Sequence, residues 1–263
     1  MIKFFRRIRQ RLLTENKFSK YLLYAIGEIV LVVIGILIAL QINTWNEERN
    51  LAKERITILQ NLREDLTNDI ENYQYSFMRL EDRLKVTEKV IVLFDNIPKT
   101  IDSATTARDL LVLGFIEDHN PTFSTYNEIQ GSGKLALINS KKIKQALANY
   151  KSTVDNFHII GSNWNEDIKD YERIVSGYFR GTIYQQFLPM DRTDVSQNQH
   201  LKFDLAEMSK NSDFISRIRH IAYFTRMEIN LKKNGIIPIC ENIIKEINTV
   251  LAFEKSKILE FEN

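Results

Sequence analysis

The chain contains very little cysteine, glycine and proline, and each shortage narrows the range of possible folds. Cys240 is the only cysteine, so no disulfide can form within the chain. Nine glycines and four prolines in 263 residues argue against a turn-rich β-sandwich and favour long helices. Because the lone thiol lies in an apolar helical pattern, a buried core position is its expected role. An interchain disulfide or a reactive thiol is the alternative.

Motifs for catalysis and metal binding are also missing. No two histidines have the i, i+4 spacing of zinc proteases, and the Glu-x-x-His pair of di-iron bundles does not occur. Asp155 and His158 could contact a metal from one helix face, but a structural site needs three or four ligands. Gly131-Ser132-Gly133-Lys134 resembles part of a phosphate-binding loop, yet Glu128 and Leu135 replace the required glycine and hydroxyl. We therefore predict no enzyme activity, no cofactor, and no catalytic or metal-binding residues.

The strongest positive feature is an apolar run from Tyr21 to Ile42 in which Glu28 is the only charged residue. As a helix, the stretch from Tyr21 to Leu40 would span roughly 30 Å at about 1.5 Å per residue, which is the thickness of a bilayer's hydrocarbon core. A soluble core helix seldom stays apolar on every face for this length. The run predicts a transmembrane helix at residues 21–42, and no second run of this length follows.

The carboxylate of Glu28 does not prevent insertion. A central charged residue opposes it by roughly 2.5–3.5 kcal/mol. The thirteen Leu, Ile and Val residues between Tyr21 and Leu40 favour insertion by roughly 4 to 8 kcal/mol in total. The apolar contribution is larger, so the helix is expected to span.

The charges on either side of the run predict its orientation. Seven basic residues precede it and only three follow within a comparable length: Lys3, Arg6, Arg7, Arg9, Arg11, Lys17 and Lys20 against Arg49, Lys53 and Arg55. Basic loops remain on the cytoplasmic side, so residues 43–263 are expected outside the cytoplasm. Tyr21, Tyr24 and Trp45 suit the aromatic belts at the two interfaces. The run is too long for a cleaved signal peptide and no small-x-small site closes it, which indicates an uncleaved anchor.

The first twenty residues form a basic amphipathic segment that is expected in the cytoplasm. Met1, Phe5, Ile8 and Leu12 recur at helical spacing, and the remaining surface is rich in Lys and Arg. Each basic residue near an anionic membrane contributes about 1 kcal/mol of attraction, which predicts lipid headgroup contacts from Lys3, Arg6, Arg7, Arg9 and Arg11. Alternatively, these charges only set the topology. The formal net charge of the whole chain is only +2, so nucleic acid is not an expected partner.

One stripe of the apolar helix is predicted to contact protein. Glu28, Val32, Gly35 and Ala39 follow one another at helical spacing, and Gly35 and Ala39 form a small-xxx-small pair. A carboxyl group facing lipid alone is costly, so the stripe should turn toward a second copy or another membrane protein. The alternative is an unpaired helix whose Glu28 takes up a proton.

The remainder of the chain predicts an all-α fold, an antiparallel bundle of long helices with coiled-coil character. Residues 45–96 contain neither Gly nor Pro. Their apolar positions are mostly three and four apart with one stutter, at Leu59, Leu62, Leu66, Ile70, Tyr73, Phe77, Leu80, Leu84, Ile91 and Phe94, with Thr87 filling the gap before Ile91. This spacing predicts one long helix leaving the membrane and ending near Pro98.

Further helices are expected from capping residues and periodicity. One begins after an N-cap Ser103, a short one opens at Pro121, and one begins after Ser140 and continues toward Phe187. The last begins at Ser212 and is kinked by Pro238. Gly131 and Gly133 are expected to form a sharp structural turn beside Tyr126, and residues 190–200 a polar loop.

Three segments together resemble an uncharacterised family of Gram-negative envelope proteins, described as a domain of unknown function. They are MIKFFRRIRQRLL, ENKFSKYLLYAIGEIVLVVIGILIALQINTWNE and TYNEIQGSGKLALI. The resemblance is specific over residues 1–48 and 126–138 and looser elsewhere. It implies a single-pass inner-membrane protein with a periplasmic helical domain, and it adds no catalytic residue.

Two functional classes fit this organisation. The first is a non-enzymatic scaffold or adaptor for envelope proteins, with the membrane, a protein partner or a second copy as its partners. The second is a sensory or ligand-binding bundle that signals through a membrane partner. A deep pocket with convergent polar groups would favour the second class, whereas an exposed apolar groove would favour the first.

Overall fold

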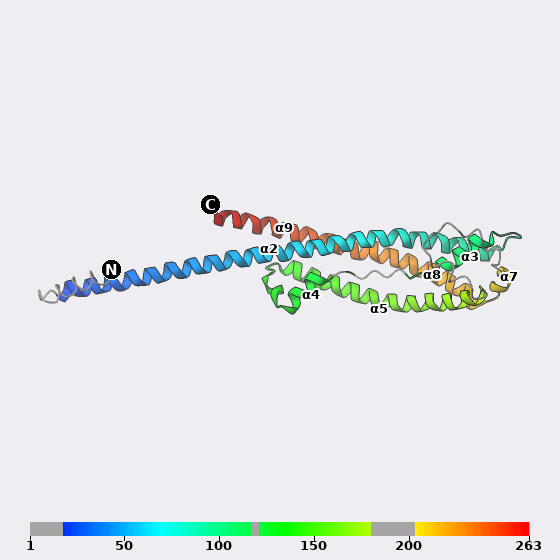
Figure 1. Ribbon diagram of the computed structural model, residues 1–263, viewed down its shortest axis with the longest axis horizontal. Coiled ribbons are helices and arrows are strands. Elements are labelled where there is room, and N and C mark those ends of the chain that lie inside the picture. The colour runs from blue at the N-terminus through cyan, green and yellow to red at the C-terminus, as the bar shows by residue number, and fades with distance from the viewer. Residues whose placement is uncertain (1–17, 117–120, 122, 180–202, 263) are drawn as a thin grey trace. The chain divides into compact units, whose positions relative to one another are not determined.

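The computed structural model describes residues 18–116, 121, 123–179 and 203–262. In these residues the chain is built of helices and connecting turns, without strands (Figure 1). The all-α prediction is therefore confirmed. Two compact units are present, one formed by Met1–Thr57 with Glu254–Asn263 and the other by Ile58–Phe253.

Helix α2 runs without interruption from Phe18 to Asp95 and contributes to both units. The absence of Gly and Pro after residue 45 permits this length, and Pro98 lies just beyond its end. Within the described residues, its apolar N-terminal part is the one segment long and apolar enough to cross a membrane, and that segment is not buried by other parts of the chain. Length and composition alone support this assignment of a span. In the same unit, Arg55 pairs with Glu254 at 2.7 Å, which joins α2 to the end of α9.

Helix α3 spans Ser103–Val112, so it begins one residue earlier than a helix capped at Ser103 would. Asp102, not Ser103, is its N-cap, because the Asp102 carboxylate accepts hydrogen bonds from the backbone N–H groups of Ala104 and Thr105. A carboxylate at this position also interacts favourably with the positive end of the helix dipole.

Helix α4 spans Ser124–Gly131, so the start predicted at Pro121 is wrong. Its cap comes from another helix: Asp65 of α2 accepts hydrogen bonds from the Ser124 hydroxyl and the Thr125 N–H at 3.1 and 3.0 Å. After α4, Gly133 has a φ of 74°, and the 3-10 helix η1 (Lys134–Leu137) packs back against α4. The predicted sharp turn is confirmed at Gly133, whereas Gly131 is the last residue of α4.

Helix α5 spans Lys141–Tyr178 and begins at the predicted cap, since the Ser140 hydroxyl accepts from the Ile143 N–H. The predicted continuation to Phe187 and the loop at 190–200 lie outside the described residues. A short helix α7 (Leu205–Met208), which the sequence did not suggest, precedes α8 (Ser212–Leu231).

The irregularity predicted at Pro238 takes the form of a π-helical turn. This turn, η3, spans Lys232–Ile236 and leads into α9 (Ile237–Glu262). The Ile237 N–H donates to the carbonyl of Lys232, five residues earlier. Proline cannot donate a backbone hydrogen bond, and the wider turn accommodates its ring without ending the helix.

The seam along α2 differs from the predicted one. The buried residues recur at three and four without a stutter: Leu59, Leu62, Leu66, Asp69, Tyr73, Ser76, Leu80, Arg83, Thr87 and Val90. Ile70, Phe77 and Leu84, which the apolar pattern assigned to the core, are only partly buried on its flank. Polar residues occupy the interior because partners on other helices satisfy their hydrogen bonds.

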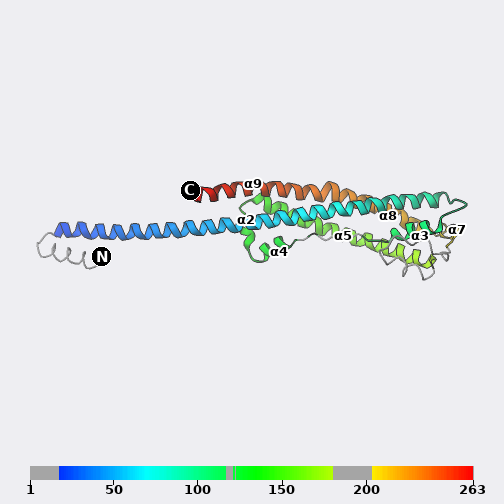
Figure 2. The same ribbon diagram turned by 45° about the horizontal axis from the view of Figure 1, so that its top comes forward.

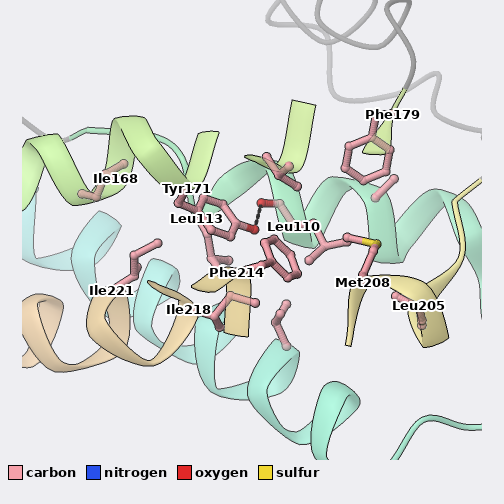
Figure 3. Close-up of a cluster of buried hydrophobic side chains, with 13 residues drawn as sticks. Leu110, Leu113, Ile168, Tyr171, Phe179, Leu205, Met208, Phe214, Ile218 and Ile221 are labelled. Atoms are coloured by element: carbon pink, nitrogen blue, oxygen red, sulfur yellow. Dashed lines mark hydrogen bonds between the residues drawn. The ribbon is translucent and has the colours of Figure 1, made fainter. Parts of the chain in front are cut away.

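Within the second unit, α5 and the α8–α9 pair lie alongside α2 (Figures 1 and 2). Arg219 of α8 pairs with Asp95 of α2, and Arg226 pairs with Glu88, so α8 runs antiparallel to α2. An apolar cluster closes one end of the bundle, where the Tyr171 hydroxyl donates to the carbonyl of Leu110 at 2.7 Å (Figure 3). Burial of these side chains, at about 25 cal/mol per Å², stabilises the packing of α3, α5, α7 and α8.

Candidate functional site

A group of charged and hydroxyl side chains lies inside the bundle, and we call it the charged layer. Its members are Ser76 and Arg83 from α2, Thr225 and Glu228 from α8, and Lys232 from the π-helical turn. All five are buried, and Lys232 is only 1% exposed. Charged side chains are almost never buried to this extent unless they are paired.

Glu228 is the centre of the charged layer. Its Oε1 accepts from the Lys232 Nζ at 2.6 Å, and its Oε2 lies 3.4 Å from the Arg83 Nη2. Lys232 Nζ also donates to the Ser76 hydroxyl at 3.1 Å, and its ammonium lies 5.6 Å from the centre of the Phe157 ring. One carboxylate therefore compensates two cations that come from different helices.

The Arg83 guanidinium extends the charged layer to a third part of the chain. Its Nε donates to the Thr225 hydroxyl at 3.1 Å, and its Nη1 donates to the Phe115 carbonyl at 3.0 Å. Phe115 lies just beyond α3, so one side chain links α2, α8 and the segment after α3. Such satisfied buried networks specify one arrangement of helices, because any other register would leave a charge without a partner.

A second buried network connects α2, α5 and α9. The Tyr150 hydroxyl donates to Asp69 at 2.7 Å, and Tyr73 and Cys240 are buried beside it. Burial raises the pKa of Tyr73 and of Tyr150, so both phenols remain protonated. Burial also raises the pKa of the Cys240 thiol to about 12, despite a hydrogen bond with Tyr150 that lowers it. The expectation of a buried Cys240 is confirmed.

The polar groups of these two networks form hydrogen bonds with one another. A thiol with a raised pKa is a poor nucleophile because the thiolate is the reactive form. In the described parts of the chain, no three His, Cys, Asp or Glu side chains lie close enough together to hold a metal ion. Asp155, which sequence spacing paired with His158, lies 3.1 Å from the Lys151 ammonium.

The predicted membrane stripe lies on the apolar part of α2. Val32, Gly35 and Ala39 are exposed there, and Glu28 is partly exposed. A Cβ built on Gly35 would meet nothing within 4 Å, so the backbone is accessible at this position. The lipid contacts predicted for Lys3, Arg6, Arg7, Arg9 and Arg11 lie outside the described residues.

Sequence reasoning missed the charged layer. Arg83, Glu228 and Lys232 look like ordinary surface charges, because polar residues on a helix usually face solvent. One signal was available: Asp69, Ser76 and Arg83 are spaced by seven, and together with the leucines they complete an unbroken heptad pattern.

Comparison with known proteins places the chain in a family. The profile described as "Family of unknown function (DUF6090)" matches residues 28–225, which is more than half of the chain. The chain belongs to this DUF6090 family. Its matched region begins inside the apolar part of α2 and ends within α8. No curated protein and no solved structure matches.

Proposed function

We propose that this DUF6090 protein is a single-pass membrane protein whose helical domain acts as a scaffold or adaptor for other envelope proteins, without catalysing a reaction. The observation that carries the proposal is helix α2, which joins an exposed apolar segment of membrane length to a packed bundle without a break. An uninterrupted helix holds a domain at a membrane more rigidly than a flexible linker would.

Charge distribution supports a cytoplasmic N-terminus and a helical domain on the opposite side of the membrane. The resemblance of residues 1–48 and 126–138 to Gram-negative envelope proteins is what implies an inner membrane and a periplasmic domain. Seven basic residues precede the apolar run and three follow it within a comparable length. Under the positive-inside rule this asymmetry retains residues 1–20 in the cytoplasm. The anionic lipids of the inner leaflet would then attract the basic segment.

The scaffold role is favoured over a ligand sensor by the form of the surface. One surface depression is lined by Glu241, Ile244, Lys245, Asn248 and Thr249, all from α9, and another by residues 43–54 of α2. Each lies along one helix and is open to solvent, unlike the concave sites that enclose small ligands. The buried polar groups of the charged layer contact one another.

The proposal is tested by fractionation and by reporter fusions. The full chain should remain in the membrane fraction after alkaline washing. A reporter that is active only in the periplasm should be active when fused after Asn263, and its cytoplasmic counterpart should be inactive. The opposite reporter pattern would reject the topology, and release by the alkaline wash would reject the anchor.

A further inference from the structure

The end of α9 covers α2 close to the point where the apolar segment stops. In the compact unit that contains the apolar segment, Arg55 of α2 pairs with Glu254 of α9 at 2.7 Å. One turn closer to the apolar segment, Ala52 is only 5% exposed, and Arg49 in the next turn is partly buried, whereas residues 40–48 are exposed. The described part of this unit outside α2 is the end of α9. The end of α9 therefore runs along α2 toward the apolar segment.

Helix geometry gives the distance from the end of α9 to a membrane spanned by α2. Arg49 lies seven positions after Ile42, the last residue of the apolar run, which corresponds to about 10 Å along the helix axis. The headgroup layer on each side of the hydrocarbon core is about 5–8 Å thick. Trp45, which suits the aromatic belt, lies about 6 Å from Arg49 along the same axis. The last turns of α9 therefore lie at the outer edge of the headgroup layer when the apolar segment spans a bilayer.

The residues at the end of α9 suit this layer through apolar contact and not through net charge. Leu259 is 60% exposed, and Ile258 beside it is partly buried. The segment 255–262 contains two basic and two acidic residues, which cancel: Lys255, Lys257, Glu260 and Glu262. A lysine at an interface can bury its apolar stem while its ammonium remains at the level of the lipid phosphates. A contact with lipid made here should therefore depend little on anionic headgroups.

We propose that the end of α9, residues 255–262, binds the lipid headgroup layer on the side of the membrane that holds the helical domain. This rests on the proposed function, because the apolar segment must span the bilayer to fix the distance. A lipid surface is favoured over a protein partner because it lies at this level in every anchored chain. Anchoring also gives the end of α9 a high effective concentration at the membrane, so a few apolar contacts suffice. The contact restricts how far α2 can tilt.

Quenching of a fluorescent label by lipid tests the contact directly. Full-length protein carrying Cys240→Ala receives one further substitution, Leu259→Cys, Thr249→Cys or Ile42→Cys, and the new thiol is labelled with a fluorescent dye. Each labelled protein is reconstituted into phosphatidylcholine vesicles that contain a lipid spin-labelled near its headgroup. We expect about threefold stronger quenching at position 259 than at the exposed position 249, which lies ten residues, or about 15 Å, farther from the membrane along α9. The label at position 42 reports on the span.

The three positions distinguish this inference from the proposed function. Quenching at position 42, with no more quenching at 259 than at 249, would reject the lipid contact and leave the span in place. Absence of quenching at 42 would reject the span, and the lipid contact with it. A requirement for added phosphatidylglycerol, or loss of quenching at 259 in high salt, would overturn the apolar contact, because salt screens only interactions between charges.

A charge substitution provides a second test with a matched control. The reporter is a label on Ser256→Cys, an exposed position near the end of α9, again in the Cys240→Ala chain. Leu259→Asp should reduce the quenching of this label about twofold, because a carboxylate is costly to remove from water. Thr249→Asp adds the same charge at an exposed position farther from the membrane and should leave the quenching unchanged. Equal quenching in the Leu259→Asp variant and in the chain with Leu259 would reject the contact.

Discussion

At the scale of single residues, the charged layer is the part of the described interior that costs most free energy to bury. Glu228 compensates Arg83 and Lys232, and each comes from a different turn or helix. Moving such groups out of water costs several kcal/mol per ion, and pairing only offsets this cost. We therefore expect the charged layer to contribute more to the specificity of helix register than to net stability.

We predict that Glu228→Ala lowers the free energy of unfolding by about 3–5 kcal/mol, since it leaves two buried cations without their carboxylate. Replacing the whole group, with Arg83→Met, Glu228→Leu and Lys232→Met, should recover most of this loss because no buried charge remains. Asp155→Ala, which removes only the exposed pair with Lys151, should change stability by less than about 0.5 kcal/mol. Denaturant titration of the full chain in detergent measures all three. A mild effect of Glu228→Ala would show that water reaches the charged layer.

Cys240 should be unreactive in the folded chain. Its thiol is fully buried and its pKa is raised to about 12, so almost no thiolate exists at neutral pH. Maleimide labelling should be slow in native protein and fast in denaturant. As a control, an exposed cysteine on the same helix, Thr249→Cys in a Cys240→Ala background, should label quickly in both conditions. Rapid native labelling of Cys240 would indicate that α9 opens readily.

The same pKa change predicts alkaline sensitivity. A raised pKa in the folded state means that the protonated thiol is favoured by folding. Its contribution to stability is complete below the ordinary pKa of 9.0 and is lost as the pH rises toward about 12. The alkaline decrease in melting temperature should therefore be smaller for Cys240→Ala than for the unchanged chain. An identical decrease would assign the effect to the buried tyrosines alone.

At the scale of elements, helix ends are determined by a few local contacts. Asp102 caps α3, Ser140 caps α5, and Asp65 caps α4 from a distance. The Ser140 cap was predicted, and the predicted Ser103 cap is one residue away from Asp102, because these caps are adjacent to their helices in the sequence. The Asp65 cap was not predicted, since Asp65 and Thr125 are 60 positions apart.

Gly133 should be intolerant of side chains because its φ of 74° is left-handed. Gly133→Val is expected to cost about 1–2 kcal/mol or more, and Gly133→Asn less, since asparagine tolerates this conformation better. Gly131→Ala is the matched control: it lies at the end of α4 and its Cβ would meet nothing within 4 Å. Thermal unfolding measures the three variants. Equal melting of Gly133→Val and Gly131→Ala would contradict the turn argument.

The cap of α3 should make stability depend on acidic pH. A hydrogen bond from the Thr105 hydroxyl, followed by backbone N–H donors, lowers the pKa of Asp102 below its ordinary 3.8. Its stabilising contribution is present above that value and is lost as pH falls through the lower folded pKa. The melting difference between the unchanged chain and Asp102→Asn should therefore shrink from about pH 5 to about pH 3. Asp82→Asn, an exposed carboxylate outside any cap, is the control.

At the scale of the whole molecule, one helix of 78 residues, α2, carries both the apolar segment and one long side of the bundle. The two compact units share α2 as a continuous element, and its second part bears the buried Asp69, Ser76 and Arg83.

We predict that the apolar segment associates through Glu28, Val32, Gly35 and Ala39. In a transmembrane association assay on residues 17–46, Glu28→Leu and Gly35→Ile should each weaken association, because one removes a hydrogen-bonding group and the other prevents close backbone approach. Leu37→Ile, which lies off the stripe, serves as the control. Unchanged association in the assay, with unchanged partner capture by the full chain, would show that the stripe faces lipid.

The sequence by itself determined the helical class, the apolar segment, most helix starts and the turn at Gly133, because these depend on spacing and on residues adjacent in the chain. Only the tertiary structure decided which face of α2 is buried. Apolar periodicity favoured Ile70, Phe77 and Leu84, whereas Asp69, Ser76 and Arg83 lie inside. Their partners are remote, as with Glu228, which is 145 positions from Arg83. A buried polar group is stable only when such a partner is in place, and that depends on packing between helices and not on local sequence.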